Sequence, residues 1–150
     1  MLLQITRWNY NYWTKFASMN EEEKNIDLKD VGEFGLIERL TKKIKLFNEN
    51  TLLGPGDDAA IINSNKEILV SSDMLVEGIH FDMAFTPLKH LGYKSVIVNI
   101  SDIYAMNGTP KQITVGLAIS SKYTLEAIEE FYDGILLACE KYKIDVIGGD

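Results

Sequence analysis

The run TLEAIEEFYDGILLACEKYKIDVIGGD, residues 124–150, decides the fold class of this chain. Its apolar residues recur at three- and four-residue steps, which predicts an amphipathic helix from an N-cap at Thr124 to about Tyr142. An apolar strand over residues 144–147 follows and enters two glycines and an acid. A helix that leads directly into such a strand is typical of mixed α/β and α+β domains. The apolar positions of the helix are Leu125, Ile128, Phe131, Tyr132, Ile135, Leu136 and Cys139.

The rest of the chain predicts further helices and strands of the same kinds. Pro87 suits the first turn of a long helix, where its missing N–H costs nothing, and residues 107–110, Asn-Gly-Thr-Pro, end that helix. The predicted fold class is therefore α+β, or mixed α/β, with a mixed sheet and two main helices. The other predicted elements are helices over 32–46 and 88–106 and strands over 51–53, 59–62, 67–72 and 113–120.

Composition narrows the function classes. The chain has 150 residues, which suits one ordinary domain, and a net charge of -7, which argues against non-specific nucleic-acid binding. No apolar run approaches the roughly 20 residues that a membrane helix needs. Cys139 is the only cysteine, so an intrachain disulfide and a cysteine-rich zinc site are excluded. Because Cys139 lies on the apolar stripe of its helix, a buried structural thiol is expected rather than a nucleophile.

The first residues differ in composition from the rest of the chain. Residues 1–16 carry five aromatic side chains among Asn and Thr, and a polar stretch from Asn20 to Asp30 follows. We expect residues 1–31 to be a disordered or extraneous extension and residues 32–150 to form the domain. An aromatic docking arm is the alternative interpretation of residues 1–18.

Four short acidic motifs stand at the ends of apolar runs or on the long helix. Carboxylates that converge on one small volume repel one another unless a cation neutralises them, and Mg²⁺ prefers such oxygen ligands, with water and substrate phosphates. The motifs therefore predict a site for Mg²⁺ and a nucleotide, although each alone is a weak signal. They are Gly54-Pro55-Gly56-Asp57-Asp58, Ser71-Ser72-Asp73, Asn99-Ile100-Ser101-Asp102 and Gly148-Gly149-Asp150.

Each motif also has a plain structural interpretation. Asp57 and Asp58 are adjacent and point to opposite faces of a strand, so at most one of them is expected to bind a metal. Asp102 lies among apolar helical residues, where a buried carboxylate needs a partner: a bound cation or, in the structural interpretation, Lys94 or an amide. His80 either carries a proton or donates to a phosphate, or it is a hydrogen-bonded structural residue. The chain contains no Walker-type loop, no G-x-G-x-x-G and no protein-kinase H-R-D motif.

Taken in order, these motifs resemble the N-terminal half of the thiamine-monophosphate kinases, a family of the aminoimidazole-ribonucleotide synthetase superfamily. The resemblance runs from about Gly32 to Asp150. Five motifs in this order over roughly 120 residues make the resemblance specific, although any one of them alone would be weak. The runs that carry it are residues 32–37, 54–60 and 71–81, Lys94 with residues 99–106, and residues 147–150.

The resemblance implies ATP-dependent transfer of a phosphoryl group to thiamine monophosphate, giving thiamine diphosphate by a direct in-line route with several Mg²⁺ ions. It also implies a cytoplasmic homodimer in which strands of two chains form one barrel. His80 would contact thiamine monophosphate, and Gly149, Asp150 and, less certainly, Tyr132 would contact ATP. The implied metal ligands are Asp58, Ser71, Ser72, Asp73, Asp102 and Asp150.

Departures from the family pattern leave alternatives open. Asn107 stands where the family usually has Gly, and Asn accepts the left-handed backbone. Ser72 stands where the family commonly has Thr, and either residue can offer the same oxygen atoms. The family has a C-terminal domain that contributes further ligands, so we expect this chain to be truncated before it and inactive alone. Another enzyme of the superfamily, of the selenophosphate or aminoimidazole-ribonucleotide type, is one alternative. A non-catalytic metal- or nucleotide-binding dimerisation module is another.

Overall fold

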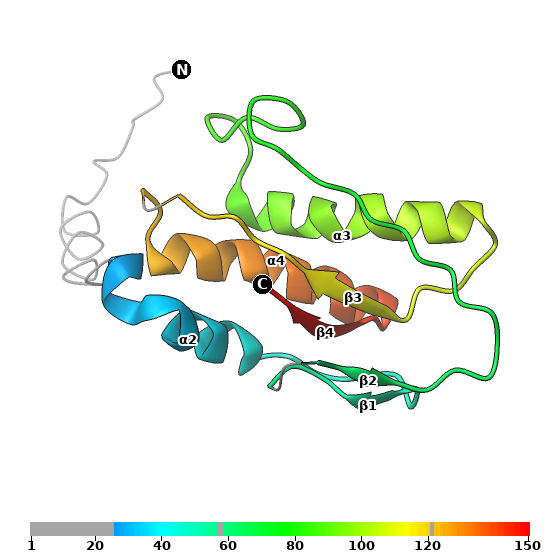
Figure 1. The fold of residues 1–150 in the computed structure, drawn as a ribbon. Coiled ribbons are helices and arrows are strands. Elements are labelled where there is room, and N and C mark those ends of the chain that lie inside the picture. Colours follow the sequence, from blue (N-terminus) through cyan, green and yellow to red (C-terminus); the bar gives the residue numbers. More distant parts are fainter. Residues whose placement is uncertain (1–25, 57–58, 121) are drawn as a thin grey trace, which may run out of the picture.

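The structure is a computed structural model that describes residues 26–56, 59–120 and 122–150 (Figure 1). The predicted mixture of helices and strands is confirmed. No helix within these ranges is long and apolar enough to cross a membrane. The elements are α2 (Leu28–Thr41), β1 (Thr51–Leu53), β2 (Ile61–Ile62), α3 (Leu88–Ala105), β3 (Gln112–Val115), α4 (Leu125–Tyr142) and β4 (Asp145–Gly149).

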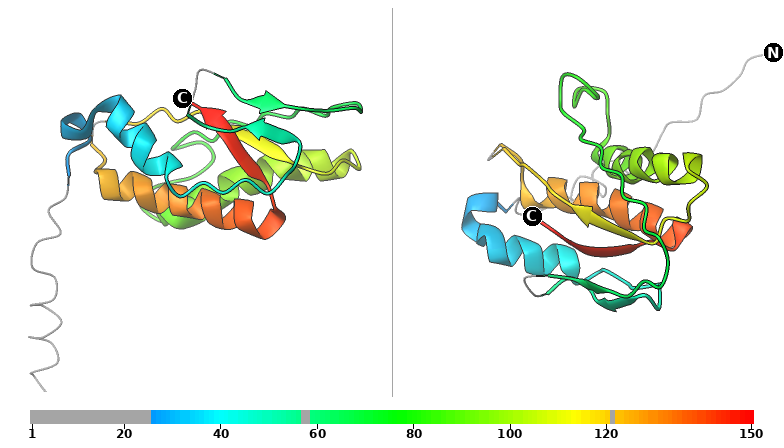
Figure 2. Two further views of the ribbon diagram at one scale, coloured as in Figure 1. Left: turned by 90° about the horizontal axis from the view of Figure 1, so that it is seen from below. Right: turned by 45° about the vertical axis from the view of Figure 1, so that its right-hand side comes forward.

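The helices α3 and α4 lie side by side and form one layer, with the strands on one side of it (Figures 1 and 2). Two glycines allow their backbones to approach closely. A Cβ at Gly92 of α3 would lie 1.9 Å from the carbonyl oxygen of Phe131, and a Cβ at Gly134 of α4 would lie 2.0 Å from that of Lys89. Any side chain at either glycine would therefore force the helices apart.

The core lies between these helices and the strands β3 and β4. The strands pair in parallel, Gln112 opposite Asp145 and Ile113 opposite Val146, with a register shift after Ile113. Parallel strands need a crossover connection, and α4 supplies it. The predicted apolar stripe of α4 is confirmed, because its buried residues include Leu125, Ile128, Ile135 and Cys139. The core cluster is Val96, Ile100, Ile135, Ala138, Cys139, Ile144 and Val146.

A fully buried carboxylate joins β4 to the segment before β1. Asp145 has no exposed surface and accepts hydrogen bonds from the backbone N–H groups of Phe47 (2.5 Å) and Asn48 (3.2 Å) and from the hydroxyl of Thr51. The Gln112 side chain also donates to the Thr51 hydroxyl, at 3.0 Å. Because three donors surround the Asp145 carboxylate, its burial is compensated by hydrogen bonds. This network fixes the start of the β1–β2 hairpin on the core.

The helix α2 begins and ends earlier than the predicted helix over 32–46. Gly32 stands inside α2 with φ 70° and ψ 170°, a conformation open to glycine, so two helical pieces meet there at a kink. Thr41 is the last helical residue, and residues 44–48 are not helical. The predicted boundary at Gly32 does not coincide with a structural one, since α2 starts at Leu28.

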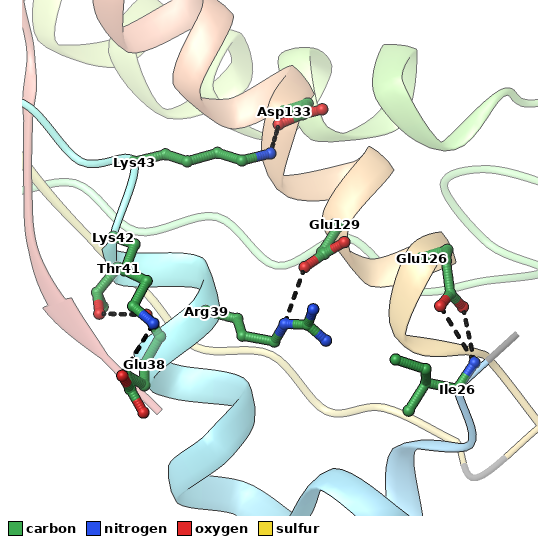
Figure 3. A network of polar contacts seen from close by, with 9 residues as sticks. All are labelled: Ile26, Glu38, Arg39, Thr41, Lys42, Lys43, Glu126, Glu129 and Asp133. Carbon is green, nitrogen blue, oxygen red and sulfur yellow. Dashed lines mark hydrogen bonds and ion pairs between the residues drawn. The ribbon is translucent and has the colours of Figure 1, made fainter. Parts of the chain in front are cut away.

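Polar contacts hold α2 and the residues around it along one side of α4 (Figure 3). The backbone N–H of Ile26 donates to the Glu126 carboxylate at 3.1 Å, and backbone N–H groups, its own first and then that of Ile26, lower the pKa of Glu126. Two ion pairs follow one turn apart on α4, Arg39 with Glu129 at 3.5 Å and Lys43 with Asp133 at 2.9 Å. Residues 26–31 are therefore part of the fold. Residues 1–25, and the interpretations placed on them, lie outside the described ranges.

The strands were only partly predicted. The β1–β2 hairpin is antiparallel, and β2 comprises Ile61–Ile62 rather than the whole of 59–62. The strand predicted over 67–72 is wrong. These residues pair with no described strand and have no regular secondary structure. β-prone side chains alone do not make a strand, because a strand also needs a neighbour to complete its backbone hydrogen bonds. The strand predicted over 113–120 is shorter, because β3 ends at Val115.

Candidate functional site

The segment 69–80 runs along α3 in the opposite direction to the helix. Leu69 packs against the C-terminal end of α3, where a Cβ on Gly108 would lie 2.6 Å from the Leu69 side chain. Further along the segment, three polar contacts reach Asp102, Asn99 and Lys94 in turn, working back towards the N-terminus of the helix. Two of the four acidic motifs therefore lie against each other, although they are far apart in sequence.

The first contact joins Ser71 to Asp102. The Ser71 hydroxyl donates to the Asp102 carboxylate at 2.9 Å. Asp102 is exposed, so the expectation that its burial demands a cation is wrong: the carboxylate stands on the outer, polar side of α3. Lys94 does not pair with it and instead donates to the backbone carbonyl of His80 at 2.9 Å. One negative charge thus faces solvent beside a hydroxyl oxygen.

The second contact joins Asp73 to Asn99. The backbone N–H of Asp73 donates to the Asn99 side-chain oxygen at 2.8 Å. Asp73 is exposed, as is Ser72 beside it. Two carboxylates and the hydroxyl oxygen of Ser71 therefore stand on neighbouring positions of the segment and the helix. These are hard oxygen donors, the kind that Mg²⁺ prefers.

His80 ends a tight loop whose backbone turns at Gly78, with φ 78°. The backbone N–H of Val76 donates to Nδ1 of His80 at 3.0 Å. A ring nitrogen that accepts a hydrogen bond carries no proton, so in the neutral ring the proton is on Nε2. The loop has neighbours on two sides. Lys94 donates to the His80 carbonyl, and Tyr123 lies beside Glu77. Burial, followed by the Glu77 carboxylate, raises the pKa of Tyr123.

The motif at Gly149 and Asp150 lies at the end of the parallel pair. Gly149 has φ 152°, and a Cβ there would lie 1.8 Å from the Val115 carbonyl oxygen, so close pairing with β3 requires glycine at this position. The Asp150 backbone continues the pairing, since its N–H donates to Val115 at 3.1 Å and its carbonyl accepts from Leu117 at 2.6 Å. The side chain of Asp150 is exposed beyond the last strand pair.

Two further residues singled out in the sequence lie at the core. Tyr132 packs against the core cluster, and burial raises its pKa. Cys139 is buried, as predicted, and its burial, together with the Asp145 charge, raises its pKa to about 12. Such a thiol is protonated at neutral pH and is not a nucleophile.

The donor set fits a metal that keeps much of its own water. No three acidic, histidine or cysteine side chains among the described residues lie close enough to hold a metal ion by themselves, and Asp57 and Asp58 fall outside those residues. Mg²⁺ is commonly bound by one or two carboxylates together with waters and substrate phosphates. The pair Asp73 and Asp102, with Ser71 bonded to Asp102, therefore fits Mg²⁺ held jointly with a phosphate-bearing ligand.

The comparison with protein families agrees with this geometry. The family model described as "AIR synthase related protein, N-terminal domain" matches residues 56–150. The chain belongs to this family. The match includes the segment 69–80, the whole of α3 and the Gly149–Asp150 motif, and it confirms the superfamily inferred from the sequence motifs.

Within the AIR synthase related family, the chain is similar to thiamine-monophosphate kinases. It is 37% identical to that of Aquifex aeolicus over 82% of this chain and 38% of the relative, and 38% identical to that of Bacillus subtilis over 79% of this chain and 37% of the relative. The chain therefore spans well under half the length of these relatives.

Solved structures show the same similarity. The crystal structure of thiamine-monophosphate kinase from Stenotrophomonas maltophilia matches with a TM-score of 0.61 and 32% identity, over 76% of this chain and 35% of that one. The structure of AaThiL complexed with AMPPCP and TMP matches with a TM-score of 0.51 and 31% identity, over 85% of this chain and 39% of that one. The AIR synthase-like fold of this chain is thus confirmed.

Proposed function

We propose that this chain is the ATP- and Mg²⁺-binding N-terminal part of a cytoplasmic thiamine-monophosphate kinase, truncated before a C-terminal domain. The reaction is transfer of the γ-phosphoryl group of ATP to thiamine monophosphate, which gives thiamine diphosphate and ADP. The observation that carries the proposal is the contact of Ser71 and Asp73 with Asp102 and Asn99, which joins two acidic motifs on one exposed surface. The similarity to named kinases, one of them complexed with AMPPCP and TMP, supports the reaction type.

The acidic surface along α3 would hold the metal. Asp73 and Asp102 would provide charge, Ser71 and Ser72 would provide neutral oxygen atoms, and Asp58 and Asp150 would complete the set. Bound Mg²⁺ supplies neutralisation of phosphate charge, which direct in-line transfer needs more than it needs a covalent intermediate. The protein's own part is to hold its carboxylates in fixed positions, and the hydrogen bond from Ser71 fixes one oxygen of Asp102.

The two ligands would contact different parts of the chain. We assign His80 to thiamine monophosphate: its Nδ1 accepts from Val76, so its protonated Nε2 can donate to a phosphate oxygen. We assign Gly149 and Asp150 to ATP, because the exposed carboxylate of Asp150 directly follows the last strand pair, Val115 opposite Gly149, and can reach a ligand there. Tyr132 is the least supported assignment, since its side chain is half-buried and packs against the core.

A second copy of the chain is the proposed partner of the β1–β2 hairpin. Leu52 of β1 is 62% exposed, and Ile61 and Ile62 of β2 are 53% and 43% exposed. Apolar strands with free edges favour pairing with another strand, and pairing across a dimer would build one barrel from two sheets. Sedimentation velocity tests the homodimer: a mass of one chain at all concentrations would contradict it.

The decisive experiment is a coupled ATP assay on the protein that continues this chain to the length of its relatives. We expect Mg²⁺-dependent turnover with thiamine monophosphate and none with selenide or an aminoimidazole-ribonucleotide precursor. Turnover with selenide or that precursor instead would show that the proposed substrate is wrong, while the family membership would stand. The 150-residue chain alone is expected to be inactive, and a normal rate from it would refute the idea that the site needs a second domain.

A further inference from the structure

Asn99 uses both halves of its side-chain amide. Its oxygen accepts from the Asp73 backbone N–H at 2.8 Å, and its Nδ2 donates to the Ser95 carbonyl oxygen, one turn earlier on α3, at 2.9 Å. The bond to Ser95 fixes which face of the amide points outward. Asn99 is also only partly exposed, so few other orientations are open to it.

The two bonds fall at neighbouring positions of both elements. Residues 71 and 73 are two apart in the segment, at most roughly 6.5 Å along the chain. Residues 99 and 102 are three apart on a helix, a rise of roughly 4.5 Å on the same face. The Asn99 bond and the Ser71–Asp102 bond therefore fasten the segment to α3 at two neighbouring points, with the backbone of Asp73 at one of them.

Charge explains why an amide suits position 99. A carboxylate there would also accept from the Asp73 N–H, but it would add a third negative charge beside Asp73 and Asp102 and could not donate to Ser95. A leucine would leave both the Asp73 N–H and the Ser95 carbonyl without this partner. The amide holds the segment and adds no charge to the acidic surface.

We propose that Asn99 is a positioning residue of the metal site: by fixing the Asp73 backbone on α3, it sets the distance between the Asp73 and Asp102 carboxylates. The inference rests on the proposed function for its biological meaning. Its physical content, that Asn99 controls how these two carboxylates bind a divalent cation together, is testable on the 150-residue chain.

The test uses Mn²⁺ as the probe and site-resolved NMR as the readout. Hydrogen exchange of the Asp73 amide measures the Asn99 bond, and Mn²⁺-induced line broadening at residues 71–73 and 99–102 measures binding. For Asn99→Leu we expect Asp73 exchange to be faster by about tenfold, the loss of one hydrogen bond, and Mn²⁺ to bind at least about fivefold more weakly. For Asn99→Asp we expect the Asp73 amide to keep its protection.

Ser101→Ala is the matched control, because among the described residues the Ser101 hydroxyl bonds only to the Val98 carbonyl of its own helix, at 2.6 Å. It should change neither readout. If Asn99→Leu does not fold, Asn99→Gln serves instead: the same groups displaced by one methylene should also weaken Mn²⁺ binding. Unchanged Asp73 exchange, or unchanged Mn²⁺ binding despite faster exchange, would overturn the inference.

These readouts separate the inference from the proposed function. In the full-length kinase, Asn99→Leu should raise the Mg²⁺ concentration needed for half-maximal rate and leave the rate at saturating Mg²⁺ nearly unchanged. A full-length protein without activity towards thiamine monophosphate would refute the proposed function. The exchange and Mn²⁺ results on the chain would still decide the role of Asn99.

Discussion

The hydroxyl of Ser71 donates to the carboxylate of Asp102 across 2.9 Å, although 31 residues separate them in the chain. The bond does more than attach a segment to a helix. It holds one carboxylate oxygen of Asp102 and leaves the other exposed for a ligand. The acidic surface therefore has a defined geometry before any cation binds, which lowers the ordering cost of binding.

Replacing Asp102 with Asn tests the role of its charge. The amide oxygen can still accept from Ser71, so the fold should be retained, while the negative charge is lost. We expect Mn²⁺ affinity of the chain to fall by at least about tenfold, about 1.4 kcal/mol. Turnover of the full-length kinase should fall by orders of magnitude. Asp133→Asn is the control, since Asp133 lies on α4 and pairs with Lys43. If both variants bind Mn²⁺ with the same affinity, Asp102 is structural.

Replacing Gly134 with Ala tests the close helix crossing. The added methyl group would lie 2.0 Å from the Lys89 carbonyl oxygen, so α3 and α4 must separate. We expect the free energy of unfolding to fall by about 2–3 kcal/mol, as for other overpacked cores. Gly116→Ala is matched to it, because the nearest atom to a Cβ there lies at 4.0 Å. Urea titration of both variants measures the difference, and equal midpoints would contradict the crossing.

The buried carboxylate of Asp145 should matter more than the exposed ones. In Asp145→Asn one oxygen becomes an NH₂ group, which must face a donor among Phe47 N–H, Asn48 N–H and the Thr51 hydroxyl. We expect a loss of about 2–3 kcal/mol in the free energy of unfolding. Asp133→Asn, which removes an exposed ion pair, should cost less than about 1 kcal/mol. Thermal unfolding of the two variants would refute the assignment if it ranked them in the opposite order.

Cys139 should be inert in the folded chain. Its pKa of about 12 lies above the ordinary thiol value of about 8.5, so the folded state holds the thiol proton more tightly than the unfolded state does. Stability from this difference is present below pH ~8.5 and is lost as the pH rises from there towards 12. A thiol reagent at pH 8 should therefore label Cys139 only in denaturant. Fast labelling of the native chain would show that the thiol is accessible.

The helices were the most predictable part of the fold. A strong three- and four-residue period runs through 125–142, and both its N-cap and its last residue were predicted, since the Thr124 hydroxyl accepts from Ala127. Asn107 also has the predicted left-handed backbone, with φ 56°. The start of α2 was not predictable, because the polar residues before Gly32 become helical only through contact of their neighbours with α4.

The sequence offers candidate residues for the site but does not predict how they are arranged. The motifs indicated oxygen ligands, but the contacts of Ser71 with Asp102 and of Asp73 with Asn99 depend on how a non-helical segment packs on α3. The roles of Lys94 and Asp145 were missed for the same reason. Lys94 binds a backbone carbonyl, which carries no sequence signal, and a single Asp at the start of a strand does not reveal that three donors surround it.

The path of residues 68–72 along α3 has a consequence for handling the protein. Ile68 is 58% exposed, Leu69 is 45% exposed and Val70 is 88% exposed, and no described strand pairs with them. An uncharged, β-prone run of this kind is a template for intermolecular strand addition and aggregation. Lys66 and Glu67 stand immediately before it, where charged residues act as gatekeepers against such association. Solubility of the chain should therefore depend on these two charges far more than on its net charge.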